Sequence, residues 1–153
     1  MTWTPFDCHA HTTFSDGQLT PEALIERVRA RGVRPSIADH ASGDVASSLK
    51  TVDAVREYLD ALAALDVARA AEFCWHDALW RELPAPVMRQ FSHRLGSLHA
   101  IELGDGSWVH MFQRHIPDGL TPDQYMDAHV ATLEQFAREM PVEILAHPTL
   151  LPL

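Results

Sequence analysis

The sequence has very little cysteine: only Cys8 and Cys74 in 153 residues. Two cysteines suggest no disulfide framework, and their scarcity argues against a structural zinc finger, which binds its metal through thiolates. Both cysteines lie in apolar, strand-like segments, so we expect two buried free thiols.

Long apolar runs and excess positive charge are also lacking. No window approaches the run of about 18 apolar residues that spans a membrane. Residues 1–5 show neither the basic region nor the apolar core of a signal peptide, so we expect a cytoplasmic protein with no membrane partner. The formal net charge of −9 argues against a nucleic-acid partner bound through its phosphates. A bound metal can reverse that sign locally, so an anionic substrate stays open.

What the sequence does have is enough apolar residues for a core and an unusual number of histidines. Hydrophobic residues make up 46% of the chain and charged residues 22%, which is ordinary for a globular protein. We interpret residues 1–153 as a single domain. Ten histidines are present, several of them in apolar segments.

Strand-like and helical segments alternate along the chain. Helix starts are indicated at Thr20 and at Thr121, because each threonine is followed by proline and an acid, and Gln124 completes a capping box. This alternation indicates parallel βαβ units and the α/β class. We expect strands over 5–10, 35–38, 67–75, 94–101 and 142–146, a hairpin return over 107–112, helices from Thr20 to about 32, over 49–65 and over 121–140, and an irregular to helical segment over 76–91.

Each of the five main strands ends in, or contains, a residue that can bind a metal. Residues i and i+2 of a strand share a face, so two histidines one residue apart can converge, and Asp16 in the following turn can bend back over them. Such residues at the carboxyl ends of parallel strands are typical of a β/α-barrel active site. The candidates are His9, His11, Asp16, Asp39, His40, Glu72, His99 and His147.

Each candidate alone has an ordinary explanation as a turn, a surface acid or a core histidine, but their placement at five consecutive strands favours a joint metal site. Imidazole with carboxylate suits Zn, Mn or Fe. Glu72 can bridge two metals, and such a centre activates water and binds phosphate oxygens. Asp39 is a candidate for orienting His40.

Other residues carry weaker signals. His76, His93, His110 and His115 are candidates for substrate contacts, and Arg69, Arg94 and Arg114 for a phosphate clamp. His129 reads as a structural residue on a solvated helix face. Trp75, Trp80 and Trp108 read as core or rim residues.

The ordered set of motifs resembles the PHP (polymerase and histidinol phosphatase) superfamily, most closely its histidinol-phosphatase branch. The resemblance spans nearly the whole chain and rests on His9-Ala10-His11 with Ser15-Asp16-Gly17, Ala38-Asp39-His40, Glu72-Phe73, Gly96-Ser97-Leu98-His99 and Leu145-Ala146-His147-Pro148. It implies a distorted (β/α)7 barrel with a trinuclear centre. The implied ligand sets are His9, His11 and Glu72 for one metal, Glu72, His99 and His147 for a second, and Asp16 with His40 for the third.

The resemblance also implies an activity: metal-dependent hydrolysis of a small phosphomonoester, most specifically L-histidinol phosphate to L-histidinol in histidine biosynthesis. Two to three divalent ions would take part, with Glu72, His99, His147 and Asp39 as the residues expected to support catalysis. A nuclease or phosphodiesterase on the same scaffold, or a non-catalytic metal-binding scaffold, are the alternatives.

One family motif, a late Asp-x-His pair that completes two of the metal sites, is absent. Five main strands also do not close a barrel, and the chain finishes on apolar residues. We therefore interpret the chain as the N-terminal part of a longer protein. For residues 1–153 expressed alone, we expect poor solubility or a molten state, because an open sheet edge and uncovered core favour aggregation.

Overall fold

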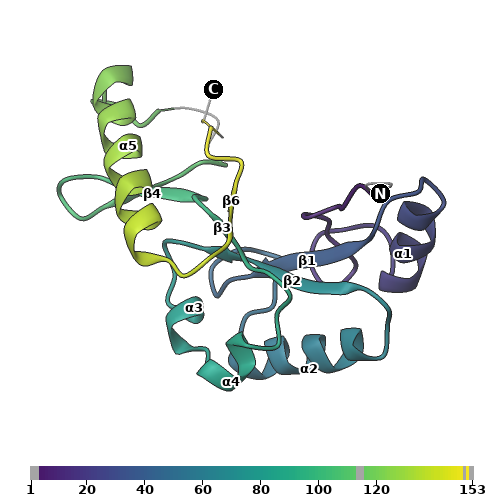
Figure 1. Cartoon of the computed structure of the whole chain (residues 1–153). Coiled ribbons are helices and arrows are strands. Elements are labelled where there is room, and N and C mark those ends of the chain that lie inside the picture. Colours follow the sequence, from purple (N-terminus) through teal and green to yellow (C-terminus); the bar gives the residue numbers. More distant parts are fainter. Residues whose placement is uncertain (1–3, 113–115, 150, 152–153) are drawn as a thin grey trace.

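The computed structural model describes residues 4–112, 116–149 and 151. Helices and strands alternate over most of this length, as the sequence pattern predicts (Figure 1). None of the helices in these residues is long and apolar enough to cross a lipid bilayer. The elements are α1 (Pro21–Arg29), β1 (Ser36–Ala41), α2 (Val52–Ala63), β2 (Ala68–Cys74), α3 (Leu79–Glu82), α4 (Ala85–Met88), β3 (Leu95–Ser97), β4 (Ala100–Glu102), β5 (Trp108–His110), α5 (Pro122–Glu139) and β6 (Ile144–Ala146).

Four strands form one parallel sheet in the order β1-β2-β3-β6. Their register places His40 of β1 opposite Glu72 of β2, and Ser97 of β3 opposite both Cys74 and Ala146. The carboxyl ends of all four strands therefore meet along one edge of the sheet. Within the described residues this sheet is open rather than a closed barrel, so the α/β class with parallel strands is confirmed at that coarser level.

Three helices begin at a threonine whose hydroxyl accepts a backbone hydrogen bond. Thr20 caps α1, Thr51 caps α2, and Thr121 forms a full capping box with Gln124 at the start of α5. Proline at the first helical position of α1 and α5 adds no unpaired donor. The predicted starts at Thr20 and Thr121 are confirmed, whereas the helix expected from residue 49 begins at Val52 because Leu49 pairs with Ala41.

The first predicted strand, over 5–10, is wrong as a strand. The segment runs extended beside β1 and makes only scattered bonds, among them the N–H of Ala38 to Ala10 O at 2.8 Å and a bridge of Phe6 with Arg34. The N–H of His9 donates instead to the Asp7 carboxylate at 3.2 Å, so this donor does not form a hydrogen bond with the sheet.

The strand predicted over 94–101 is in fact two strands in different sheets. β3 stays in the parallel sheet, and β4 pairs antiparallel with β5 as the expected hairpin return. The predicted strand over 142–146 shortens to β6 (144–146). The change of direction between Ser97 and Ala100 carries His99 to the carboxyl end of the sheet.

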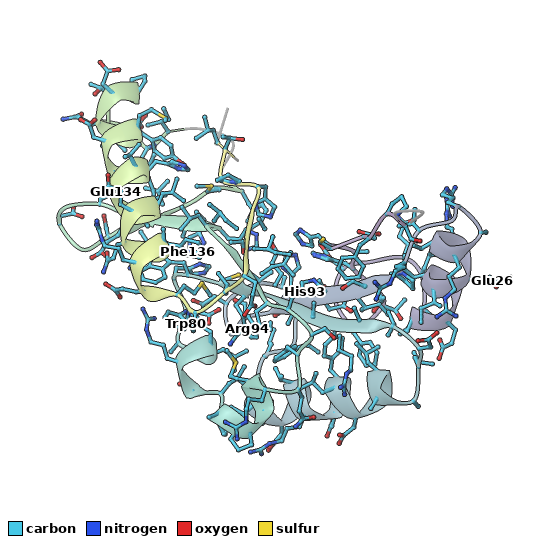
Figure 2. The ribbon with its side chains drawn as sticks, viewed as in Figure 1. Glu26, Trp80, His93, Arg94, Glu134 and Phe136 are labelled. Atoms are coloured by element: carbon cyan, nitrogen blue, oxygen red, sulfur yellow. The ribbon has the colours of Figure 1, made fainter. Side chains whose placement is uncertain are left out.

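The core packs between the sheet and its helices. α2 lies under β1 and β2, and α5 lies beside β4 (Figure 1). Phe136 of α5 is buried over Gly96 of β3, where an added Cβ would lie 2.5 Å from its ring, while Glu134 lies on the exposed side of the helix (Figure 2). The buried Tyr58 hydroxyl lies 3.1 Å from Ile37 O and donates to Ala70 O at 2.7 Å, fixing α2 to the strands.

Candidate metal centre

The structure brings all seven expected ligands together at the carboxyl ends of the parallel strands. The ligands come from five segments that are distant in sequence, and Glu72 near the end of β2 lies in the middle with no exposed surface. His40 lies on β1, while the other ligands come from the segment before α1 or from just beyond a strand. These other ligands are His9, His11, Asp16, His99 and His147.

One carboxylate oxygen of Glu72 faces three imidazoles. Its Oε2 lies 3.2 Å from Nε2 of His9, 3.1 Å from Nε2 of His11 and 2.9 Å from Nδ1 of His40. The two histidines of the His-x-His motif also meet each other, with 2.9 Å between their Nε2 atoms. Four nitrogen and oxygen atoms so close to one another are ordinary around a metal ion and crowded without one.

The other oxygen of Glu72 faces a separate pair of histidines. Its Oε1 lies 2.8 Å from Nε2 of His147 and 3.5 Å from Nε2 of His99. The two rings are stacked, with centroids 5.3 Å apart. Glu72 therefore presents each of its oxygens to a different set of imidazoles, which is the arrangement of a carboxylate that bridges two ions.

Asp16 extends the cluster on the more exposed side. Its Oδ1 lies 2.7 Å from Nδ1 of His11, and its Oδ2 lies 3.6 Å from Nε2 of His40. Each of these two histidines consequently lies between Asp16 and Glu72 and turns one ring nitrogen toward each carboxylate. The predicted pairing of Asp16 with His40 is present. Asp16 also contacts His11, and the order of the motifs in the sequence does not reveal this second contact.

The donor atoms fit a metal ion on geometric grounds. Within the described residues, three groups have ligand atoms within 4.8 Å of one another: His9 with His11 and Glu72, His11 with Asp16 and His40, and His40 with Glu72 and His99. Nδ1 of His40 and Oε2 of Glu72 are buried and 2.9 Å apart, yet neither has a properly directed hydrogen bond. Buried polar atoms normally have a partner, and a shared cation would supply one for both.

The charges in the cluster also suit a cation. Burial by itself raises the pKa of Glu72, yet the surrounding imidazoles, led by His11 and His147, hold it far below its usual range. Burial by itself lowers the pKa of His11, but the neighbouring carboxylates of Glu72 and Asp16 outweigh it and raise that pKa to about 9. Without metal, Glu72 is ionised and His11 carries a proton at neutral pH, a proton that a metal ion would displace.

Asp39 serves a different purpose from the expected one. Neighbouring residues on a strand point to opposite faces, so Asp39 points away from the ring of His40. Its buried carboxylate accepts hydrogen bonds from the N–H and hydroxyl of Thr12, both at 2.7 Å, and from the hydroxyl of Ser15 at 2.6 Å. Asp39 thereby holds the loop that carries Asp16.

His129 is buried, so the prediction of a solvated helix position is wrong. Its Nε2 lies 2.9 Å from the carbonyl oxygen of Pro148, the residue after His147. His147 itself has φ of 30°, an uncommon conformation for a residue other than glycine. The contact from α5 helps to keep that backbone in place, and no sequence pattern signals a contact between residues so far apart.

The prediction of two buried thiols is confirmed for Cys74, which contacts His99, and is wrong for Cys8, which is half-buried. Of the weaker candidates, Arg94 pairs with Glu143 and His93 contacts Cys8 O, both near the amino ends of the strands and away from the cluster. His76 and His110 lie together near the carboxyl ends, with ring centroids 5.3 Å apart. Arg69 lies near the amino end of β2. Trp75 and Trp80 are buried in the core, as expected, and Trp108 is exposed. Arg114 and His115 lie outside the described residues.

No protein-family model matches the chain, and no curated protein is significantly similar to it in sequence. An inference about function therefore rests on the chemistry of the site and on the resemblance of the motifs described above.

Proposed function

We propose that this protein is a metal-dependent phosphatase that hydrolyses a small phosphomonoester, with L-histidinol phosphate as the favoured substrate. The observation that supports it most is Glu72, whose two oxygens face separate groups of imidazoles. Divalent ions held there by Glu72 and the histidines would activate water and offset the charge of a transferring phosphoryl group. The fold we propose is a distorted PHP-type (β/α)7 barrel, of which the described open sheet is a part.

The ligands of this chain would bind two to three divalent ions, which would be Zn, Mn or Fe. Oε2 of Glu72 with His9 and His11 suits one ion, and Oε1 with His99 and His147 suits another. Asp16 with His40 suits a third, where Asp16 is the most exposed of the ligands. Nitrogen and oxygen donors of this kind bind all three metals, and their geometry alone does not select among them.

The remaining residues of the site position the ligands. The Asp39 carboxylate holds the loop before α1 in place. Asp16 is therefore already positioned near His11 and His40, and the loop does not need to become ordered when a metal binds. Because the chain carries a net charge of −9, attraction of an anionic substrate depends on the bound cations. This favours a small substrate whose phosphate reaches the ions over a long nucleic acid that needs a basic surface.

The test is phosphate release by the purified protein after chelation and reloading with Mn²⁺ or Zn²⁺. The substrate panel includes histidinol phosphate, other small phosphomonoesters and a single-stranded oligonucleotide. We expect turnover of monoesters that Glu72→Gln and His99→Ala both abolish. Faster turnover of the oligonucleotide would indicate a nuclease instead, and full metal loading without any turnover would indicate a non-catalytic scaffold; either result refutes the proposal.

A further inference from the structure

The ring of His99 lies between a carboxylate and a thiol. Its Nε2 is 3.5 Å from Oε1 of Glu72, and its Nδ1 is 2.9 Å from Sγ of Cys74. The next neighbour of Nδ1 is the hydroxyl of Ser97 at 3.4 Å, which also lies 3.3 Å from Phe73 O, an acceptor for its proton. His99 and Cys74 are almost completely buried, so water does not compete for these nitrogens.

A thiol is an unusual partner for a metal-binding histidine. A histidine that binds a metal through Nε2 keeps its proton on Nδ1 and normally donates it to a carboxylate or a carbonyl, groups that can only accept. A thiol can donate its proton or accept one, in both cases weakly. The Cys74 side chain is fully buried and lies against Nδ1 of His99, so the thiol is placed to act in either direction.

We propose that Cys74 is a positioning residue that lets His99 exchange its tautomer when metal binds. Without metal, the proton of His99 is on Nε2, which faces Oε1 of Glu72, and the Cys74 S–H donates to Nδ1. With metal on Nε2, the proton is on Nδ1 and donates to Sγ of Cys74. One proton leaves Nε2 and one joins Nδ1, so the exchange itself changes no charge on the ring. The thiol keeps its proton throughout and only rotates it away from the ring.

This inference rests on the proposed metal centre and predicts different results for three variants. Cys74→Ala removes the thiol partner of Nδ1 in both the metal-free and the metal-bound state. The affinity for the ion on the Oε1 side of Glu72 then falls by about tenfold or more, the range for loss of an orienting partner. Cys74→Ser keeps a group that donates and accepts, so it retains most of that affinity. Cys8→Ala is the matched control, because the one hydrogen bond of the Cys8 thiol in the described part of the chain is to Phe6 O, at 3.9 Å. We expect no change for this variant.

The decisive experiment is NMR of ¹⁵N-histidine-labelled protein, metal-free and loaded with Zn²⁺, in which ring ¹⁵N shifts distinguish the two tautomers. We expect the Nε2–H form of His99 without metal and the Nδ1–H form with it. Zn²⁺ titration by calorimetry then compares wild type with the three variants. The wild-type spectra test the proposal even if Cys74→Ala does not fold.

A His99 tautomer that is the same with and without Zn²⁺ would overturn the inference, as would Cys74→Ala binding Zn²⁺ like the wild type. Both outcomes leave the proposed phosphatase intact. Tautomer exchange in a protein that releases no phosphate from any substrate would instead support the inference and refute the enzyme. Wild-type protein that binds no Zn²⁺ would refute both.

Discussion

Replacing Glu72 with glutamine is the sharpest test of the metal centre. The change keeps the shape of a side chain with no exposed surface and removes its charge. In the metal-free protein, Glu72 is ionised and His11 is protonated. The variant therefore removes the buried one of the two carboxylates that face the partly buried His11 and leaves only the more exposed Asp16. Breaking a buried ion pair costs about 3 kcal/mol even at the low end of measured values. For a chain of this length, the melting temperature would fall by roughly 6–12 °C.

The metal-loaded protein should show a second, independent difference. An ion present at 100 times its dissociation constant stabilises the native state by about 2.7 kcal/mol, so Zn²⁺ should raise the melting temperature of the wild type by several degrees. Glu72→Gln removes the negative charge that the carboxylate offers to both ions. We therefore expect almost no rise in the melting temperature of this variant when Zn²⁺ is added. Elemental analysis after dialysis should show fewer bound ions per chain.

The assay is a thermal melt with and without Zn²⁺, read by circular dichroism. Glu102→Gln is the matched control, because Glu102 is an exposed glutamate on β4. We expect its melting temperature and metal content to equal those of the wild type. Glu72→Gln protein that keeps both its metal content and the Zn²⁺-induced shift would refute the bridging role of Glu72, and with it the proposed centre.

Three further predictions concern stability. Asp39→Asn weakens the hydrogen bonds that hold Thr12, so urea denaturation should show a loss of about 2–3 kcal/mol; an unchanged midpoint would contradict this role. Because the pKa of His11 rises from 6.5 unfolded to about 9 in the native state, its contribution of at most about 3 kcal/mol is complete below pH 6.5 and disappears as the pH rises through 9. Denaturation of metal-free protein across this range should show the decline, and a rise would refute it. Gly96→Ala forces its Cβ against Phe136 and should cost about 1–3 kcal/mol in a thermal melt, with partial recovery when Phe136→Leu is added.

Local chemistry made much of the fold predictable. The caps at Thr20 and Thr121 depend on residues within one helical turn, so the sequence was sufficient to place them. The ends of the strands were harder to predict, because hydrogen bonding to a neighbouring segment decides them. The segment over 5–10 has the composition of a strand, yet Asp7 takes the N–H of His9 and the ladder does not form.

The positioning residues could not be predicted from the sequence. Asp39 and His40 are adjacent in sequence, and only the strand geometry shows that one holds the loop of Thr12 while the other faces Glu72. The solvated position expected for His129 was wrong, because the helical pattern does not reveal that the chain returns over it at Pro148.

The sequence by itself determined which side chains can bind a metal and that four of them, His40, Glu72, His99 and His147, lie at or near a strand end, because strand periodicity and residue chemistry are local properties. Only the tertiary structure decided how those side chains share Glu72. His147 and Glu72 are 75 residues apart in the chain and 2.8 Å apart at their polar atoms. The parallel register that unites them depends on the packing of β1, β2, β3 and β6 together, which no single segment encodes.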